Sequence, residues 1–267
     1  MIKIVVCGAA GRMGKRIIAC AAEDDQCKVV GAVDSADHPD KGRDSGEISG
    51  TGKNGVVITD DLSSVIDGAD VVIDFSHHSV TSKVAGICAK SKKPLVVGTT
   101  AITADELKEI NKFSKDIPLI VAPNMSVGAN MVFSKAGEIA KILGDDYDIE
   151  IVEAHHRMKK DAPSGTANRI ADVIAKAVNA DMDKDGVYGR KGNQALRKKG
   201  EIGVHAVRAG DIVGDHTVIY CGNGERIELV HRAHSRDTFA KGAIRAAKYV
   251  LNAKPGSYDM FDVLDLK

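Results

Sequence analysis

Short apolar runs alternate with helix-like stretches through the first half of the chain, and this rhythm constrains the fold more than any other feature. The runs are rich in β-branched residues and span 2–7, 29–33, 56–59, 70–75, 95–97 and 119–121. Continuous apolar runs of this kind are typical of parallel strands that are covered on both faces. The stretches between them predict helices, one of which opens on a capping box of Thr103 and Glu106. Strand, helix, strand in repetition predicts a doubly wound parallel α/β sheet.

The rhythm changes after Pro123, and the change predicts a second domain. Its expected elements are a helix over 126–143, a strand over 148–154, a helix from about Thr166, and antiparallel strands over 202–207, 216–221 and 226–230. Residues 181–200 are rich in Gly, Lys and Asp and are interpreted as a mobile loop. We therefore expect an N-terminal domain over residues 1–126 and an α+β domain over residues 127–236.

Composition argues against several classes of function. Among 267 residues, 37 Lys and Arg balance 37 Asp and Glu, so bulk attraction to nucleic acid or to an anionic membrane is not expected. No apolar run approaches the roughly 18–20 residues that span a bilayer, and the chain starts directly with a predicted strand, so we expect neither a membrane span nor a signal peptide. The five scattered cysteines favour buried, reduced thiols in a cytoplasmic protein over disulfides or a zinc site.

A glycine-rich turn, Gly8-Ala9-Ala10-Gly11-Arg12-Met13-Gly14, follows the first predicted strand and opens a helix. Glycines let the backbone approach a pyrophosphate, whose charge is favoured by N–H groups at the helix start. Ala10 stands where the usual G-x-G-x-x-G pattern has its middle glycine. About twenty residues later the second strand ends at Asp34, where an acid holds the adenine ribose hydroxyls of NAD. This context favours a dinucleotide site over a purely structural turn.

The residue after Asp34 bears on which dinucleotide binds. It is Ser35, so a 2′-phosphate would meet a carboxylate without an adjacent guanidinium, and NADH is favoured over NADPH. Cations in the loop at 38–43 leave NADPH usable. Two later strand ends, Gly98-Thr99-Thr100 and Ala122-Pro123-Asn124-Met125, are also expected to face the ligand, because ligands collect at the carboxyl ends of strands in open α/β sheets.

The most unusual segment, 153–167, reads Glu-Ala-His-His-Arg-Met-Lys-Lys-Asp-Ala-Pro-Ser-Gly-Thr-Ala. Ser164 or its neighbour can cap a helix, and N–H groups beside Gly165 and Thr166 suit a carboxylate. On composition alone, a solvated basic loop with an ordinary cap remains an alternative. A metal site is not favoured, because adjacent histidines on a strand point to opposite faces and no Asp or Cys ligand set accompanies them. Three other histidines are interpreted as structural or solvent-facing: His205, His231 and His234.

Together with the glycine turn, Asp74-Phe75-Ser76 and the C-terminal Phe261-Asp262-Val263-Leu264-Asp265-Leu266, this segment resembles the 4-hydroxy-tetrahydrodipicolinate reductase (dihydrodipicolinate reductase) family of the diaminopimelate route to lysine. The resemblance covers the whole chain, and its His-His-Arg-x-Lys-x-Asp-Ala-Pro-Ser-Gly-Thr pattern is close to diagnostic. It implies an N-terminal Rossmann domain that the tail over 237–267 rejoins, and an inserted substrate domain whose sheets associate into a homotetramer. Family members reduce a cyclic dicarboxylate with NADH or NADPH and release water, giving tetrahydrodipicolinate.

The resemblance also implies roles for individual residues. His155 falls at the proton donor/acceptor position and Lys159 at the proton donor position, while the substrate carboxylate is held by His156, Gly165 and Thr166. The positions expected to bind the dinucleotide are Gly8, Ala9, Ala10, Gly11, Arg12, Met13, Asp34, Gly98, Thr99, Thr100, Ala122, Pro123, Asn124 and Met125. Ser35 and His77 stand where NADPH-competent members often carry arginine, a departure that bears on cofactor choice.

Two other functions remain open on the sequence. A two-domain oxidoreductase of the homoserine or aspartate dehydrogenase type would share the architecture, but it does not explain the segment from His155 to Ala167. A non-enzymatic NAD-sensing regulator would usually carry a DNA-binding module, and the neutral charge and the lack of a basic recognition helix count against one.

Overall fold

The computed structural model describes residues 1–267, which form two compact units. The first unit comprises Met1–Val127 and Arg236–Lys267, and the second comprises Gly128–Ser235. Each unit is built on its own sheet. None of the helices combines the length and the apolar content needed to cross a membrane.

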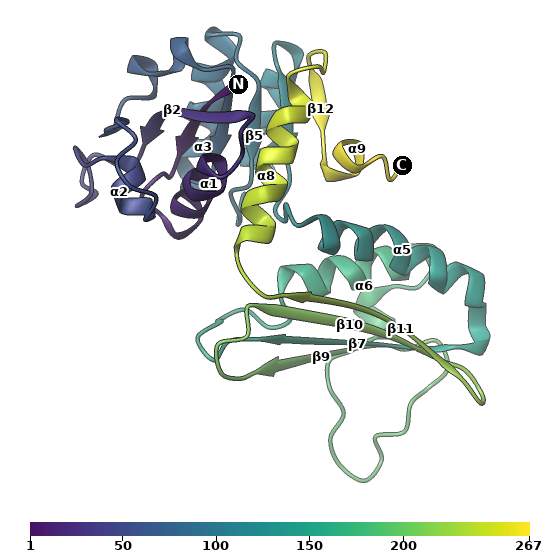
Figure 1. The fold of residues 1–267 in the computed structure, drawn as a ribbon. Helices are drawn as coiled ribbons and strands as arrows, with labels where there is room; N and C mark the ends of the chain where they lie inside the picture. The colour runs from purple at the N-terminus through teal and green to yellow at the C-terminus, as the bar shows by residue number, and fades with distance from the viewer. The chain divides into compact units, whose positions relative to one another are not determined.

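The first unit has a seven-stranded sheet in the order β12-β6-β5-β4-β1-β2-β3, and every strand pair in it is parallel (Figure 1). Its strands are β1 (Ile2–Cys7), β2 (Cys27–Val33), β3 (Ile58–Thr59), β4 (Val71–Asp74), β5 (Leu95–Val97), β6 (Pro118–Val121) and β12 (Gly256–Tyr258). The central strands are buried on both faces, which is why the sequence shows continuous apolar runs there. The order reverses between β1 and β4, so their carboxyl ends form a topological switch point.

Helices cover both faces of this sheet, as the doubly wound prediction requires. They are α1 (Arg12–Ala22), α2 (Ser45–Ser49), α3 (His78–Lys90), α4 (Ala104–Lys112), α8 (Asp237–Val250) and α9 (Met260–Leu264), with short 3₁₀ turns η1 (Leu62–Ser64), η2 (Ile66–Gly68) and η3 (Phe113–Lys115). Ile4 and Val6 belong to a core with α1 and α8, whereas Val5 belongs to a core with α3 and α4. Thr103 and Glu106 form the predicted capping box. The predicted fold class is confirmed.

The C-terminal segment completes the first unit. Helix α8 packs beside α1, and β12 pairs in parallel with β6 as an edge strand (Figure 1). Arg16 of α1 donates two hydrogen bonds to Asp237 at the start of α8, at 2.6 and 2.8 Å. Because this pairing is bidentate, it fixes the orientation of the two side chains as well as their separation.

The second unit has a five-stranded sheet in the order β11-β10-β7-β9-β8, with α5 and α6 over one face (Figure 1). Its elements are α5 (Val127–Leu143), η4 (Gly144–Asp146), β7 (Asp148–His155), α6 (Gly165–Val178), α7 (Met182–Asp185), β8 (Gly186–Val187), β9 (Ile202–Arg208), β10 (Gly214–Cys221) and β11 (Arg226–Ala233). Tyr220 of β10 is fully buried and donates its hydroxyl to the Ala136 carbonyl of α5 at 2.7 Å. A Cβ added at Gly137 would lie 2.9 Å from the Val173 carbonyl oxygen, so glycine allows α5 and α6 to pack closely.

Two features of this unit differ from the sequence prediction. Strand β10 pairs antiparallel with both β7 and β11, but β9 runs parallel to β7, so the prediction of three antiparallel strands is wrong for β9. The chain between β7 and β9 is long enough to cross over through α6 and return in the same direction. The segment over 181–200, predicted as a mobile loop, contains the short elements α7 and β8, and its residues 188–200 form neither helix nor strand. Arg190 and Arg197 then pair with Glu150 of β7, which ties this segment to the sheet.

Candidate active site

The predicted dinucleotide-binding residues lie at one edge of the first sheet. The glycine turn follows β1, Asp34 follows β2, Gly98-Thr99-Thr100 follows β5 and Ala122-Pro123-Asn124-Met125 follows β6. Because the strands are parallel, their carboxyl ends meet at the same edge, which includes the switch point between β1 and β4.

The backbone of the glycine turn fits a pyrophosphate. Gly8 has a φ of +73°, and a Cβ added there would lie 2.5 Å from the Phe75 carbonyl oxygen. A Cβ added at Gly14 would lie 2.1 Å from the Gly8 carbonyl oxygen. The N-cap of α1, Gly11, has no side-chain cap, and the first turn contains no acidic residue. Unobstructed N–H groups at a helix start favour an anion, so these residues fit the phosphate groups of a dinucleotide.

The alanine at the middle glycine position does not obstruct this turn. The side chain of Ala10 is 6% exposed and belongs to the core between the sheet and α1, and its N–H donates to Oδ2 of Asp34 at 2.8 Å. Oδ1 of Asp34 accepts the N–H of Ser35, also at 2.8 Å. Asp34 therefore braces the turn, a role that the sequence did not indicate. Each of its oxygens keeps a second lone pair that can accept a ribose hydroxyl.

The later strand ends contribute mainly backbone to this edge. A Cβ added at Gly98 would lie 2.0 Å from the Phe75 ring. The hydroxyl of Thr99 is buried and donates to the Ser76 carbonyl at 3.2 Å, which joins the ends of β5 and β4. The side chains of Ala122 and Met125 are buried, so these two residues present only main-chain atoms to a ligand. Of the other predicted positions, Arg12, Thr100 and Pro123 are exposed, whereas Met13 and Asn124 are partly buried.

In the second unit, the segment over 153–167 joins β7 to α6. His155 is the last residue of β7, and Ser164 is the N-cap of α6, its Oγ accepting the N–H of Ala167 at 3.2 Å. The first turn of α6 contains no acidic residue, and a Cβ added at Gly165 would meet no atom within 4 Å. The start of α6 is therefore accessible to an anionic group, as the sequence indicated.

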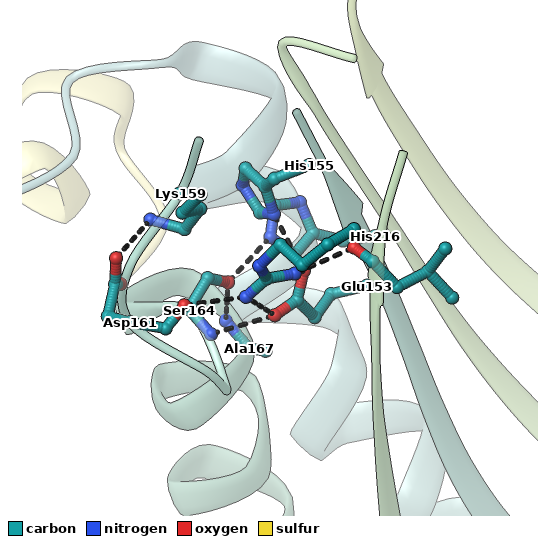
Figure 2. A network of polar contacts seen from close by, with 9 residues as sticks. Glu153, His155, Lys159, Asp161, Ser164, Ala167 and His216 are labelled. Atoms are coloured by element: carbon teal, nitrogen blue, oxygen red, sulfur yellow. Dashed lines mark hydrogen bonds and ion pairs between the residues drawn. The ribbon is translucent and has the colours of Figure 1, made fainter. Parts of the chain in front are cut away.

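A buried carboxylate, Glu153, organises this segment (Figure 2). It is fully buried on the same face of β7 as His155, and its Oε2 lies 2.6 Å from Nδ1 of His155. Its oxygens also accept the N–H of Ser164 at 3.0 Å and two guanidinium hydrogen bonds from Arg208, both at 2.8 Å. Burial acts to raise the pKa of Glu153, but these donors outweigh burial and hold the pKa below its usual value.

The contact with Glu153 identifies the donor nitrogen of the His155 ring. A carboxylate only accepts hydrogen bonds, so Nδ1 of His155 is the donor, and Nε2 is the nitrogen left to exchange a proton. Burial lowers the pKa of His155, and the charge of Glu153 opposes this effect. The neighbouring His216 ring lies 5.2 Å away between centroids, and burial lowers its pKa to about 3, so it is neutral. Its Nε2 is 3.2 Å from Oγ of Ser164.

His156 and Lys159, which the family resemblance also assigns to the site, lie between β7 and α6. Nζ of Lys159 pairs with Oδ1 of Asp161 at 2.9 Å (Figure 2). His156 lies just beyond β7, partly buried, and its backbone N–H donates to the Ile212 carbonyl at 2.8 Å. The structure contains no group of three or more His, Cys, Asp or Glu side chains that could hold a metal ion.

Two family models match the chain. The model described as "Dihydrodipicolinate reductase, N-terminus" matches residues 2–125, and the one described as "Dihydrodipicolinate reductase, C-terminus" matches residues 128–264. The chain belongs to the dihydrodipicolinate reductase family. The family resemblance inferred from the sequence is confirmed.

Individual relatives agree with this membership. Proteins named 4-hydroxy-tetrahydrodipicolinate reductase from Syntrophus aciditrophicus and Geotalea uraniireducens are 51% and 52% identical to the chain, in both cases over 267 residues and the full length of both sequences. A dipicolinate-bound dihydrodipicolinate reductase from Paenisporosarcina sp. TG-14 shares the fold, with a TM-score of 0.78, 22% identity and 98% coverage of each chain. An amine dehydrogenase from Mycobacterium smegmatis shares it more distantly, with a TM-score of 0.60, 14% identity, and 96% and 94% coverage.

In this member of the dihydrodipicolinate reductase family, three residues around His155 received no role from the sequence: Glu153, Arg208 and His216. Glu153 had a local signal, because residues two apart on a strand share a face, and an acid on the buried face of β7 needs a partner. Arg208 and His216 had none, because they lie on strands whose register with β7 arises only on folding.

Proposed function

We propose that this chain reduces 4-hydroxy-tetrahydrodipicolinate to tetrahydrodipicolinate with NAD(P)H and loss of water, within the diaminopimelate route to lysine. The observation that carries the proposal is the full-length match to relatives of that name, at 51–52% identity. The proposal is preferred to a homoserine or aspartate dehydrogenase and to an NAD-sensing regulator because it also accounts for the His155–Ala167 segment.

His155 and Lys159 carry the proton transfers in this proposal. The nicotinamide, when bound, supplies a hydride, and negative charge left on an unsaturated nitrogen-containing ring must then be neutralised by a proton. Nε2 of His155 can deliver it, because Nδ1 is engaged by Glu153. Lys159, held beside Asp161, offers a second N–H⁺ donor on the same segment. These two side chains therefore protonate the substrate and stabilise the charge that develops on it.

The start of α6 binds a substrate carboxylate in this proposal. His156, Gly165 and Thr166 are its ligands, supported by the open space at Gly165 and by the absence of an acid in the first helical turn. Helix N-terminal N–H groups stabilise negative charge, and the cation of Lys159 adds to the attraction. A dicarboxylate is thus a better match for this segment than a neutral amino acid.

The edge of the first sheet binds the dinucleotide, and we assign NADH as the preferred cofactor with NADPH usable. Asp34 would accept the ribose hydroxyls, and Ser35 offers no guanidinium to a 2′-phosphate. Lys41 and Arg43, the nearest cations of the following loop, are each already paired with an aspartate, at 2.7 and 2.5 Å. These pairings leave less positive charge for a 2′-phosphate, which supports a preference for NADH.

We further assign dinucleotide binding to residues 1–126 with the tail over 237–267, and substrate binding and homotetramer assembly to residues 127–236. Assembly is supported by the sheet face opposite α5 and α6, where Val207 and Val230 are 44% and 40% exposed. Light scattering after gel filtration tests the assembly, and the expected mass is four times that of the chain.

All five cysteines are free, which supports a cytoplasmic location.

The decisive experiment measures oxidation of NADH and of NADPH with freshly synthesised substrate. We expect substrate-dependent oxidation of both cofactors, faster with NADH. Aspartate semialdehyde serves as the competing substrate, since a homoserine dehydrogenase reduces it. If the cofactors are oxidised with aspartate semialdehyde but not with the proposed substrate, or if neither compound supports oxidation, the proposed function is contradicted.

A further inference from the structure

One buried carboxylate in the second unit exchanges no proton with the substrate in the reaction outlined above, although three elements of the site meet at it. Glu153 is fully buried, and its hydrogen bonds are made to groups of the site: Nδ1 of His155, the N–H of Ser164, and the guanidinium of Arg208. A fully buried carboxylate is costly unless its oxygens are paired. These hydrogen bonds offset the cost of burying Glu153, and they lie where the proposed proton donor and the carboxylate-binding turn come together.

The contacts made by Arg208 extend the reach of Glu153 to the segment that carries Lys159. Its guanidinium donates to both oxygens of Glu153, and Nη2 also donates to the carbonyl of Asp161 at 2.6 Å. Asp161 in turn pairs with Nζ of Lys159. Glu153 and Arg208 thus connect the end of β7, the loop after it and the N-cap of α6 through a few direct hydrogen bonds.

The charges that face His155 come from several elements. Lys159 from the loop and Arg208 from β9 are positive, and both act against protonation of the ring. His216 from β10 is neutral and presents the edge of its ring. Glu153 is the negative group among them, so its loss would leave His155 facing cations alone.

We propose that Glu153, held by Arg208, is the positioning residue that fixes His155 as a donor through Nδ1 and leaves Nε2 to transfer the proton. The inference rests on the proposed function, in which His155 is the proton donor. Its logic is that of any acid that orients a catalytic imidazole: the acid sets the tautomer and favours the protonated ring without touching the substrate. The same carboxylate holds Ser164, so the donor and the carboxylate-binding turn keep a constant separation.

The test compares Glu153→Gln with a matched control on the same strand. Glu150 lies on the opposite face of β7 and is also bound to a histidine and two arginines, namely His205, Arg190 and Arg197. We expect Glu153→Gln to lower kcat roughly tenfold or more. We also expect the alkaline limb of the kcat profile, where His155 loses its proton, to move about one pH unit lower. Glu150→Gln should leave that limb in place, with unchanged mass by light scattering. An unmoved limb in folded Glu153→Gln would overturn the inference.

Two further measurements test the same role of Glu153. If Glu153→Gln does not fold, Arg208→Lys is measured instead. Lysine keeps the positive charge at position 208 but cannot donate to both oxygens of Glu153 as the guanidinium does, so kcat should fall several-fold while the alkaline limb stays in place. Wild-type kcat in Arg208→Lys would count against the proposed role of the guanidinium. Exchange of the imidazole C2 hydrogen, followed by mass spectrometry without substrate, reports protonation of His155 directly. Its midpoint should fall in Glu153→Gln and stay constant in Glu150→Gln.

The exchange measurement also separates failure of this inference from failure of the proposed function. If the wild type shows no reductase activity, the proposed function fails, while a midpoint that moves in Glu153→Gln still supports the positioning role. If the wild type is active and the midpoint stays constant, the positioning role is wrong and the proposed function stands.

Discussion

Replacing Gly14 by alanine is the most direct test of how the glycine turn is built. A Cβ at this position would lie 2.1 Å from the Gly8 carbonyl oxygen and 2.6 Å from Cα of Ala9, both backbone atoms that cannot rotate away. Ordinary contact begins at 3.4 Å. The start of α1 or the turn must therefore move by the difference between 3.4 and 2.1 Å, about 1.3 Å. Overpacking of this kind typically costs about 1–3 kcal/mol, and we expect a value near the upper end, about 3 kcal/mol.

The free energy of unfolding from urea titrations and the Kd for NADH from fluorescence titration measure the two consequences. We expect Gly14→Ala to lose about 3 kcal/mol of stability and to bind NADH at least roughly tenfold more weakly, because the displaced atoms belong to the proposed phosphate-binding turn. Gly68→Ala is the control, since a Cβ there would meet no atom within 4 Å. It should change the stability by no more than about 1 kcal/mol. Wild-type stability and NADH affinity in Gly14→Ala would refute the proposed packing of the turn.

Three further predictions concern the proposed proton donors, the choice of cofactor and the pH dependence of stability. His155→Ala and Lys159→Ala should each lower kcat by about 10²–10⁴-fold with the fold intact by circular dichroism, and near-wild-type turnover in both would remove them from the mechanism. The kcat/KM for NADH should exceed that for NADPH about tenfold, and Ser35→Arg should narrow or reverse this ratio because the guanidinium can pair with the 2′-phosphate. An unchanged ratio would show that the residue after Asp34 does not set the preference between the two cofactors. The depressed pKa of Glu153 stabilises the folded chain, and this contribution is complete above the usual glutamate pKa of about 4.5 and is lost as the pH falls through the lower folded-state pKa. In urea titrations below that usual pKa, the free energy of unfolding should therefore fall less steeply with decreasing pH for Glu153→Gln than for the wild type. Parallel curves would count against the contribution.

Much of the first unit could be predicted from the sequence because its signals are local. Apolar runs marked its strands, and Thr103 with Glu106 marked the start of α4, since each feature depends on residues close together in the chain. The glycine turn and Asp34 were located for the same reason. The bracing of the turn by Asp34 was not, because its bond to Ala10 joins residues that come together only when β2 lies beside β1.

By itself, the sequence determined the fold class, the family and the segment that holds His155 and Lys159, because spacing along the chain encodes strand and helix periods and an unbroken motif. Tertiary structure decided which groups surround that segment. Glu153 received its bidentate partner when β9 paired in parallel with β7, which brought Arg208 beside it from 55 residues away. The ring of His216 reached His155 through antiparallel pairing of β10 with β7. Strand pairing depends on register and on the burial of one sheet face, which are properties of the folded chain, so no local pattern could specify these neighbours.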